Sequence, residues 1–186
     1  RSVGASVYFT VDGYKELIEV FTTRPDTLFG VSFMTLAPEH PLVAKITTQA
    51  QKQEVENYVQ ATAARSERER MSDVKNISGV FTGAYAIHPF TEEKIPIWIG
   101  DYVLAGYGTG AVMAVPCGDQ RDYDFAKHFD LPIKNIFADK DISEAAHIDK
   151  NNTQIAHSDF LNGLDVGQAT KEVIRQLLAT KKGTAQ

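Results

Sequence analysis

The spacing of hydrophobic residues predicts strands in two parts of the chain. Residues 7–11 and 18–23 read as two strands around a turn at Asp12-Gly13, a dipeptide typical of hairpins. Further stretches are rich in β-branched and aromatic residues and are separated by Gly and Pro. They cover residues 31–37, 80–90, 95–99 and 111–115, and residues 133–137 are a further candidate.

Helical spacing predicts helices between and after these strands. A helical stretch opens at His40-Pro41 and continues over residues 50–65, and a second helix is expected over 119–129. The second helix should turn Phe125, His128 and Phe129 toward the core. Asp165 can cap a last helix whose apolar face recurs every three or four residues, with Gly183 just past its end. That face comprises Val166, Ala169, Val173, Ile174, Leu177 and Leu178.

Two polar stretches lack such spacing. Residues 66–72 (SERERMS) are highly charged and read as a solvated loop or a helix end, and residues 139–152 are polar and irregular. Strands and helices mix without regular βαβ alternation. We therefore expect an α/β fold on a mixed or barrel-like sheet flanked by helices, with residues 1–186 forming a single domain. The pattern alone leaves the topology open.

Composition narrows the class of protein. The chain has 186 residues, is 43% hydrophobic and 23% charged, as is ordinary for a globular domain, and has a net charge of -5. A stand-alone nucleic-acid binder normally carries a basic face, so any RNA contact should be small and supported by other domains. Cys117 is the only cysteine, which fits a reducing cytoplasm. No apolar run approaches the ~20 residues of a membrane span. The absence of an initial Met suggests a fragment of a larger protein.

The first polar motif is TTRPDT at residues 22–27, which follows an apolar strand and precedes Gly30. Pro25 cannot donate a ladder hydrogen bond, so the strand ends here in a loop. Three threonines and an arginine at a strand end are unusual for a core. Their hydroxyls suit a water or a ribose oxygen, although threonines that bond their own backbone in a turn would look the same.

The second motif is GTGAVMAVP at residues 108–116, followed by CGDQRD. It reads as a glycine-rich turn, a strand and the opening of a helix, with Asp119 placed as N-cap and Asp122 in the first turn. One aspartate is enough to cap, so Asp122 is also a candidate to bind a ligand ammonium. The motif lacks the lysine and the glycine spacing of a phosphate loop.

Other catalytic arrangements find little support. The five histidines show no metal-ligand spacing, so we expect no metal, and no G-x-S-x-G elbow is present. His40 and His88 each precede a proline and are expected in turns. Cys117 has no evident histidine base and is a poor candidate for a nucleophile.

The two motifs carry a resemblance. FTTRPDT, with GYGTGAVMAVP and DQRDYDFA later in the chain, resembles the editing domain of leucyl-tRNA synthetases of bacterial type. HPFTEEKIPIW and FLNGLD resemble its linking segments. In this family the domain is an insertion, the connective polypeptide, in a class I synthetase. The resemblance therefore implies proofreading in protein biosynthesis: hydrolysis of the ester of mischarged tRNA(Leu), with the 3'-terminal adenosine and the rest of the synthetase as partners. No cofactor, membrane or DNA is expected, and ATP would serve only the synthetic domain.

The resemblance also implies roles for single residues. Thr22 and Thr23 match threonines that line the scissile ester and place the attacking water, and Asp122 matches the aspartate that holds the substrate's α-ammonium. Thr27 matches the threonine that bars leucine. Two further sets are implied: Arg24 and Asp119 as polar residues near the site, paired with each other, and Tyr107, Met113 and Val115 as the lining of the side-chain pocket.

One departure and two alternatives accompany the resemblance. Many family members have a histidine directly before the first aspartate, where this chain has Gly118. That histidine is therefore absent or replaced here. A non-catalytic module that binds aminoacyl-tRNA ends, or the related isoleucyl or valyl editing domain, would share the threonine-rich element.

Overall fold

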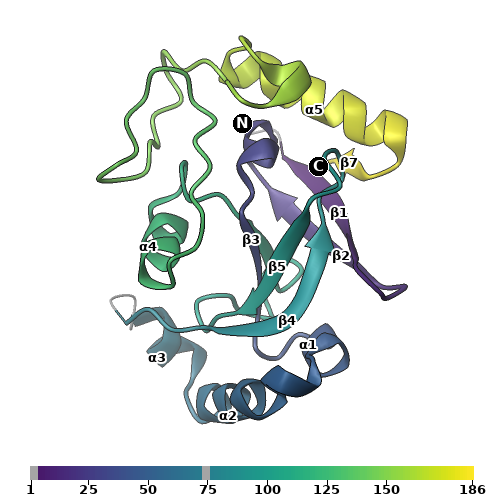
Figure 1. Cartoon of the computed structure of the whole chain (residues 1–186), viewed down its shortest axis with the longest axis vertical. Coiled ribbons are helices and arrows are strands. Elements are labelled where there is room, and N and C mark those ends of the chain that lie inside the picture. Colours follow the sequence, from purple (N-terminus) through teal and green to yellow (C-terminus); the bar gives the residue numbers. More distant parts are fainter. Residues whose placement is uncertain (1–3, 73–75) are drawn as a thin grey trace. The chain divides into compact units, whose positions relative to one another are not determined.

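The computed structural model describes residues 4–72 and 76–186, and its helices and strands are labelled in Figure 1. The strands are β1 (Ala5–Val11), β2 (Leu17–Thr22), β3 (Phe33–Leu36), β4 (Val80–Ile87), β5 (Lys94–Ile99), β6 (Ala111–Ala114) and β7 (Gly183–Ala185). The α-helices are α1 (Leu42–Ile46), α2 (Lys52–Ala63), α3 (Glu67–Ser72), α4 (Gln120–His128) and α5 (Val166–Thr180). Short 3₁₀ helices are η1 (Pro25–Gly30), η2 (Gln49–Gln51) and η3 (Asp159–Leu161).

The chain folds as two compact units, and each contains discontinuous segments. Of the described residues, one unit comprises 4–7, 21–32 and 114–186, and the other comprises 8–20, 33–72 and 76–113. The hydrogen-bonded strand order is β2-β1-β4-β5-β3-β6, and β7 pairs with β1. β3 runs parallel to β5, whereas β4 is antiparallel to β1 and β5. The sheet is therefore mixed, as the sequence predicted.

The unit of residues 8–20 and 33–113 is built on the alternation of β4 and β5. In β5 the alternate residues Ile95, Ile97 and Ile99 are almost completely buried, whereas Lys94, the first residue of the strand, is exposed. β5 therefore turns one face to the core. β4 bends at a bulge beside Gly83, whose φ is +84°. A Cβ at Gly83 would lie 2.1 Å from Thr48 Oγ1, so only glycine lets the segment before α2 approach the strand.

The charged segment at residues 66–72 is helical, in contrast to the solvated loop or helix end that we expected. It forms α3, and Arg70 is buried within it while the residues before it are exposed. The predicted strand at 31–37 shortens to β3. The helix over 50–65 is confirmed as η2 followed by α2.

The other unit contains α4, α5 and the edge strand β7. Asp165 caps α5 with a complete capping box, in which its side chain and that of Gln168 each accept from the other's backbone. Lys181, at φ +60°, ends the helix in the left-handed conformation. Gly183 is therefore not the helix-terminating residue that we expected. It begins β7, where a Cβ would lie 2.3 Å from Ser6 O, so glycine permits close pairing with β1.

Three further expectations for this unit are wrong. Residues 133–137 form no strand and contribute only a single bridge, between Phe137 and Ile155. His128 is exposed, because the buried face of α4 is formed by residues 122, 123, 125 and 126. Leu178 is 53% exposed, since it lies ~100° around the helix from the buried Leu177.

Candidate active site

The threonine-rich motif lies where β2 ends and η1 begins. Pro25 occupies the first position of this 3₁₀ helix, where its fixed φ fits and no N–H is needed. The Oγ1 of Thr22 accepts a hydrogen bond from the backbone N of Arg24 at 2.9 Å. This is the turn in which a threonine bonds its own backbone, and it leaves the hydroxyl proton of Thr22 free to donate elsewhere. Thr23 is exposed.

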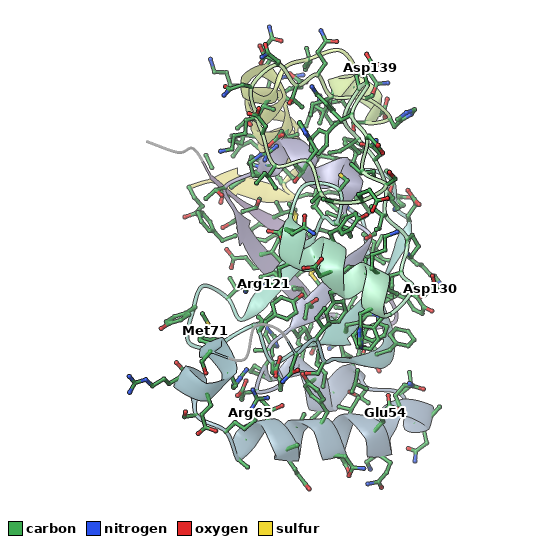
Figure 2. The ribbon with its side chains drawn as sticks, turned by 90° about the vertical axis from the view of Figure 1, so that its left-hand side faces the viewer. Glu54, Arg65, Met71, Arg121, Asp130 and Asp139 are labelled. Atoms are coloured by element: carbon green, nitrogen blue, oxygen red, sulfur yellow. The ribbon has the colours of Figure 1, made fainter. Side chains whose placement is uncertain are left out.

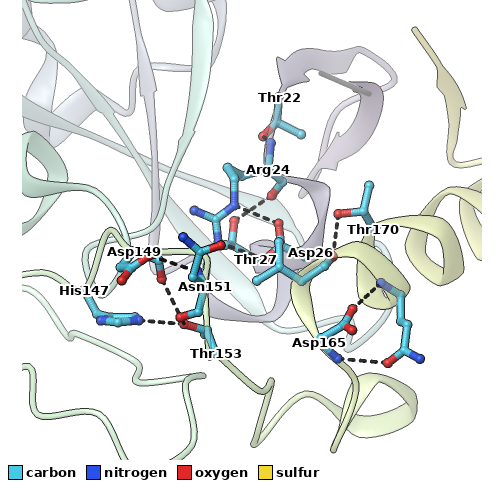
Figure 3. Close-up of polar contacts among 12 residues, drawn as sticks. Thr22, Arg24, Asp26, Thr27, His147, Asp149, Asn151, Thr153, Asp165 and Thr170 are labelled. Carbon is cyan, nitrogen blue, oxygen red and sulfur yellow. Dashed lines mark hydrogen bonds and ion pairs between the residues drawn. The ribbon is translucent and has the colours of Figure 1, made fainter. Parts of the chain in front are cut away.

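Arg24 forms an ion pair with Asp26. Its Nε and Nη2 donate to the two carboxylate oxygens, each at 2.9 Å, in the bidentate geometry that Figure 3 shows. Asp26 is fully buried, whereas the Arg24 side chain is 20% exposed. The expected pairing of Arg24 with Asp119 is therefore wrong, because the turn folds the guanidinium back onto its own helix. Asp26 was not among the residues predicted from the sequence, although its place in the first turn of a Pro-initiated helix was a signal.

Thr27 is buried and its hydroxyl is already engaged. Its Oγ1 donates to the carbonyl oxygen of Arg24 at 2.8 Å (Figure 3), and the residue is only 3% exposed. A β-branched side chain has few χ1 rotamers, and this bond selects one of them. The Thr27 side chain is therefore held in one conformation.

Asp119 and Asp122 act together at the start of α4. The Oδ1 of Asp119 accepts from the backbone N of Asp122 at 2.9 Å, which confirms Asp119 as the N-cap. The Oδ2 of Asp122 accepts from the backbone N of Val115 at 3.0 Å, so this carboxyl ties the helix to the end of β6. Burial, and then the charge of Asp119, raise the pKa of Asp122 to about 8. A buried carboxyl of this kind binds a proton or another cation strongly.

The first motif and the end of the second, from residue 114 onward, belong to the same unit. The backbone N of Ser32, just after η1, donates to the carbonyl oxygen of Ala114 at 3.0 Å. A Cβ at Gly30 would lie 3.1 Å from Cγ1 of Val115, so the glycine lets η1 approach this residue closely. Val115 is buried; its side chain lies close to Gly30, and its backbone N donates to Asp122.

Tyr107 and Met113 belong to the unit of residues 33–113. Tyr107 is 67% exposed in the glycine-rich turn, and Met113 is buried in β6. Gly108 and Gly110 of this turn have φ of +59° and +73°, which explains the glycines of the motif. The implied role of both residues in the side-chain pocket stays a prediction.

Cys117 lacks the environment of a nucleophile. It is fully buried, and burial raises the pKa of its thiol to about 11. His40 and His88 lie in turns, as predicted, and each uses Nδ1 to accept backbone N–H groups that follow it. Across residues 4–72 and 76–186, no group of three His, Cys, Asp or Glu side chains is placed to hold a metal ion.

A loop covers the position where this chain has Gly118 in place of histidine. The backbone N of His147 donates to Cys117 O at 2.8 Å, and Ala146 N donates to Gln120 Oε1 at 3.0 Å. Tyr123 of α4 anchors the same loop by donating to Ile142 O at 2.9 Å. The predicted irregular segment 139–152 is therefore fixed to the start of α4.

Comparison with known proteins defines the class of this site. Residues 1–178 match the family described as leucyl-tRNA synthetase, editing domain. A leucine–tRNA ligase of Christiangramia forsetii is 66% identical over 183 residues, which cover 98% of this chain and 19% of that protein. One of Flavobacterium johnsoniae is 69% identical over 182 residues, covering 95% of this chain and 19% of the relative. The site is thus that of a synthetase editing domain.

A solved structure supports the same conclusion. The ternary complex of Agrobacterium radiobacter K84 agnB2 LeuRS with tRNA and LeuAMS matches with a TM-score of 0.76 and 31% identity, over 100% of this chain and 20% of that one. The chain belongs to the leucyl-tRNA synthetase editing domain family. This confirms the predicted α/β fold class and decides against the isoleucyl or valyl alternative. The chain spans about a fifth of the length of the curated relatives it matches. No helix in the part of the chain described here is long and apolar enough to cross a membrane.

Proposed function

We propose that this chain hydrolyses the ester bond of tRNA(Leu) that carries a wrong amino acid, with norvaline and isoleucine as substrates and leucine excluded. The family supports this class of reaction. The observation that carries the proposal is the buried carboxyl of Asp122, which is tied to the end of β6 and flanked by Asp119. A buried carboxylate destabilises the folded chain unless a bound cation balances its charge.

Asp122 holds the α-ammonium of the misattached amino acid. In a buried environment a carboxylate–ammonium pair is stronger than in water, because the local dielectric is low. The bound ammonium takes the place of the proton that the raised pKa keeps on the free carboxyl. All standard α-amino acids share this ammonium group, so Asp122 fixes the substrate's position without selecting its side chain.

Thr22 and Thr23 place the attacking water. The water oxygen adds to the ester carbonyl carbon, the bond to the ribose oxygen breaks, and that oxygen leaves as a hydroxyl after taking up a proton. An aminoacyl ester is already activated, so orientation of the water and stabilisation of the oxyanion are sufficient. The ribose hydroxyl or the amine of the substrate assists the proton transfer. The Cys117 thiol, with its raised pKa, takes no part.

Thr27 selects against leucine by shape. A hydrophobic synthetic site separates near-isosteric amino acids by only ~1–3 kcal/mol, so a second sieve is needed. The Thr27 hydroxyl is held by Arg24 O, which fixes its methyl group as a wall. A γ-branched side chain meets this wall, whereas a straight or β-branched one passes.

The test is deacylation of tRNA(Leu) charged with norvaline, isoleucine or leucine. We expect hydrolysis of the first two esters and not of the third, with Asp122→Ala as the inactive control. If the folded chain binds these tRNAs but hydrolyses none of them, it is a non-catalytic module for aminoacyl-tRNA ends. Because the net charge is -5, the rest of the synthetase should supply most of the affinity for tRNA.

A further inference from the structure

A buried arginine stands out in the charged helix α3. Arg70 is 5% exposed, although the residues on either side of it are exposed. A buried guanidinium is tolerated only when its donors are paired. Here Nε donates to Asp101 O at 3.0 Å, Nη2 donates to Val103 O at 3.0 Å, and Nη1 pairs with the carboxylate of Glu39.

The two carbonyl groups belong to the turn that follows β5. The same turn is held by two side chains from the α2 region: Tyr58 Oη accepts from Asp101 N at 2.9 Å, and Arg65 Nη1 pairs with the Asp101 carboxylate at 2.7 Å. Figure 2 shows Arg65 at the junction of α2 and α3. Arg70 is the member of this set that reaches Val103, the residue closest to the glycine-rich loop.

The loop at residues 104–110 begins directly after this turn. It consists of two consecutive turns, in which Tyr107 N donates to Leu104 O and Gly110 N donates to Tyr107 O, both at 3.2 Å. Its far end is fixed because Gly110 O accepts from Ala37 N at 2.8 Å. Ala37 closes a turn with His40, and this turn contains Glu39, the ion-pair partner of Arg70. Arg70 therefore supports the loop at its first end directly and at its second end through Glu39.

We infer that Arg70 is a positioning residue for substrate binding, which it supports by fixing the loop that carries Tyr107. This inference rests on the proposed function and on the role in the side-chain pocket that the family resemblance implies for Tyr107. Arg70 keeps the loop in one conformation, and the groups proposed for the chemistry lie in other segments. When the binding-competent conformation becomes rarer, the apparent affinity falls by the same factor and the chemical step is unchanged.

The test compares Arg70→Met with Glu39→Ala and with a control, Arg68→Met, at an exposed position of the same helix. Hydrogen exchange of the peptide covering residues 104–113 and the kinetics of norvalyl-tRNA(Leu) deacylation are measured for each variant. For Arg70→Met we expect KM to rise about tenfold with kcat unchanged, which requires the loop to be open most of the time, so its amides should lose nearly all protection from exchange. Glu39→Ala should give a smaller change in both measurements. Arg68→Met should match the parent chain.

A general loss of structure would reduce kcat per mole of chain, so the division between KM and kcat separates positioning from stability. Unchanged exchange and KM in folded Arg70→Met, or a loss confined to kcat, would overturn the inference. If Arg70→Met does not fold, Glu39→Ala decides alone, because it removes a partner that is 40% exposed. If the parent chain hydrolyses no ester, the proposed function fails, while hydrogen exchange still tests the support of the loop.

Discussion

Asp122→Asn separates the structural from the functional contribution of the buried carboxyl. Asparagine has nearly the same shape and keeps an oxygen to accept from Val115 N. It carries no charge, so it removes the desolvation cost and the repulsion by Asp119 that raise the pKa of Asp122 to about 8. We therefore expect the variant to be more stable than the parent chain at neutral and alkaline pH, and to be inactive.

The magnitude follows from proton linkage. The pKa of Asp122 is near 8 in the folded chain and near 3.8 in the unfolded chain. Between these two pH values the carboxyl is protonated in the folded chain and ionised in the unfolded chain. Stability therefore increases as pH falls through this window and is lost as pH rises toward 8, by up to ~1.4 kcal/mol per unit. At pH 7 the interval from 3.8 is about 3 units, which corresponds to roughly 4 kcal/mol. Asparagine recovers part of the cost that appears above the folded pKa, and we expect a gain of ~1–4 kcal/mol at pH 8.

The assay is urea unfolding of both proteins from pH 5 to pH 9, together with deacylation of norvalyl-tRNA(Leu). The difference in unfolding free energy between the two proteins should change with pH below 8 and become constant above it. Other titrating groups, such as His40, contribute equally to both and cancel. If the asparagine variant is less stable at pH 8, or if the difference in unfolding free energy does not depend on pH, burial does not destabilise the charged carboxyl of Asp122. Full activity in the variant would refute its role with the ammonium.

Three further predictions concern specificity and chemistry. Thr27→Ala should hydrolyse leucyl-tRNA(Leu) ten- to a hundredfold faster than the parent chain, because relief of the clash with the γ-branched side chain is worth ~1–3 kcal/mol. Thr27→Tyr should block all editing. An Ala variant that still spares leucine would show that Thr27 does not exclude leucine. EDTA should leave deacylation unchanged, and inhibition reversed by zinc or magnesium would contradict a metal-free reaction. Iodoacetamide at pH 8 should not label Cys117 in the folded chain, because burial raises the pKa of its thiol to about 11; rapid labelling would show that the thiol is accessible.

Sequence patterns predicted the elements whose signals are local. The strand at residues 95–99, the capping residues Asp119 and Asp165, and the turn histidines His40 and His88 depend on a few neighbouring residues, and each was found as expected. The hydroxyl and carboxyl groups of the candidate site could be proposed from the sequence because they occur as two compact motifs.

The errors concern features that depend on residues distant in sequence. The burial of Arg70 requires Glu39, Asp101 and Val103, which no local pattern connects with it. Gly183 resembles a helix terminator until its closeness to Ser6 is known. Arg24 was assigned to the wrong aspartate because charge pairing depends on the direction of the side chain, and sequence spacing does not contain that direction.

The structural and catalytic interpretations of the motif residues are compatible, because each side chain uses different atoms for the two purposes. The Oγ1 of Thr22 accepts from Arg24 N and retains its proton to donate. The Oγ1 of Thr27 donates to Arg24 O, so the proposed exclusion of leucine would use its methyl group. Asp122 accepts from Val115 N through Oδ2, so the role proposed for it with the ammonium would use Oδ1. The backbone bonds fix these groups before substrate arrives, and such preorganisation is what electrostatic catalysis requires. A turn or cap made by a motif residue is therefore no argument against its catalytic role.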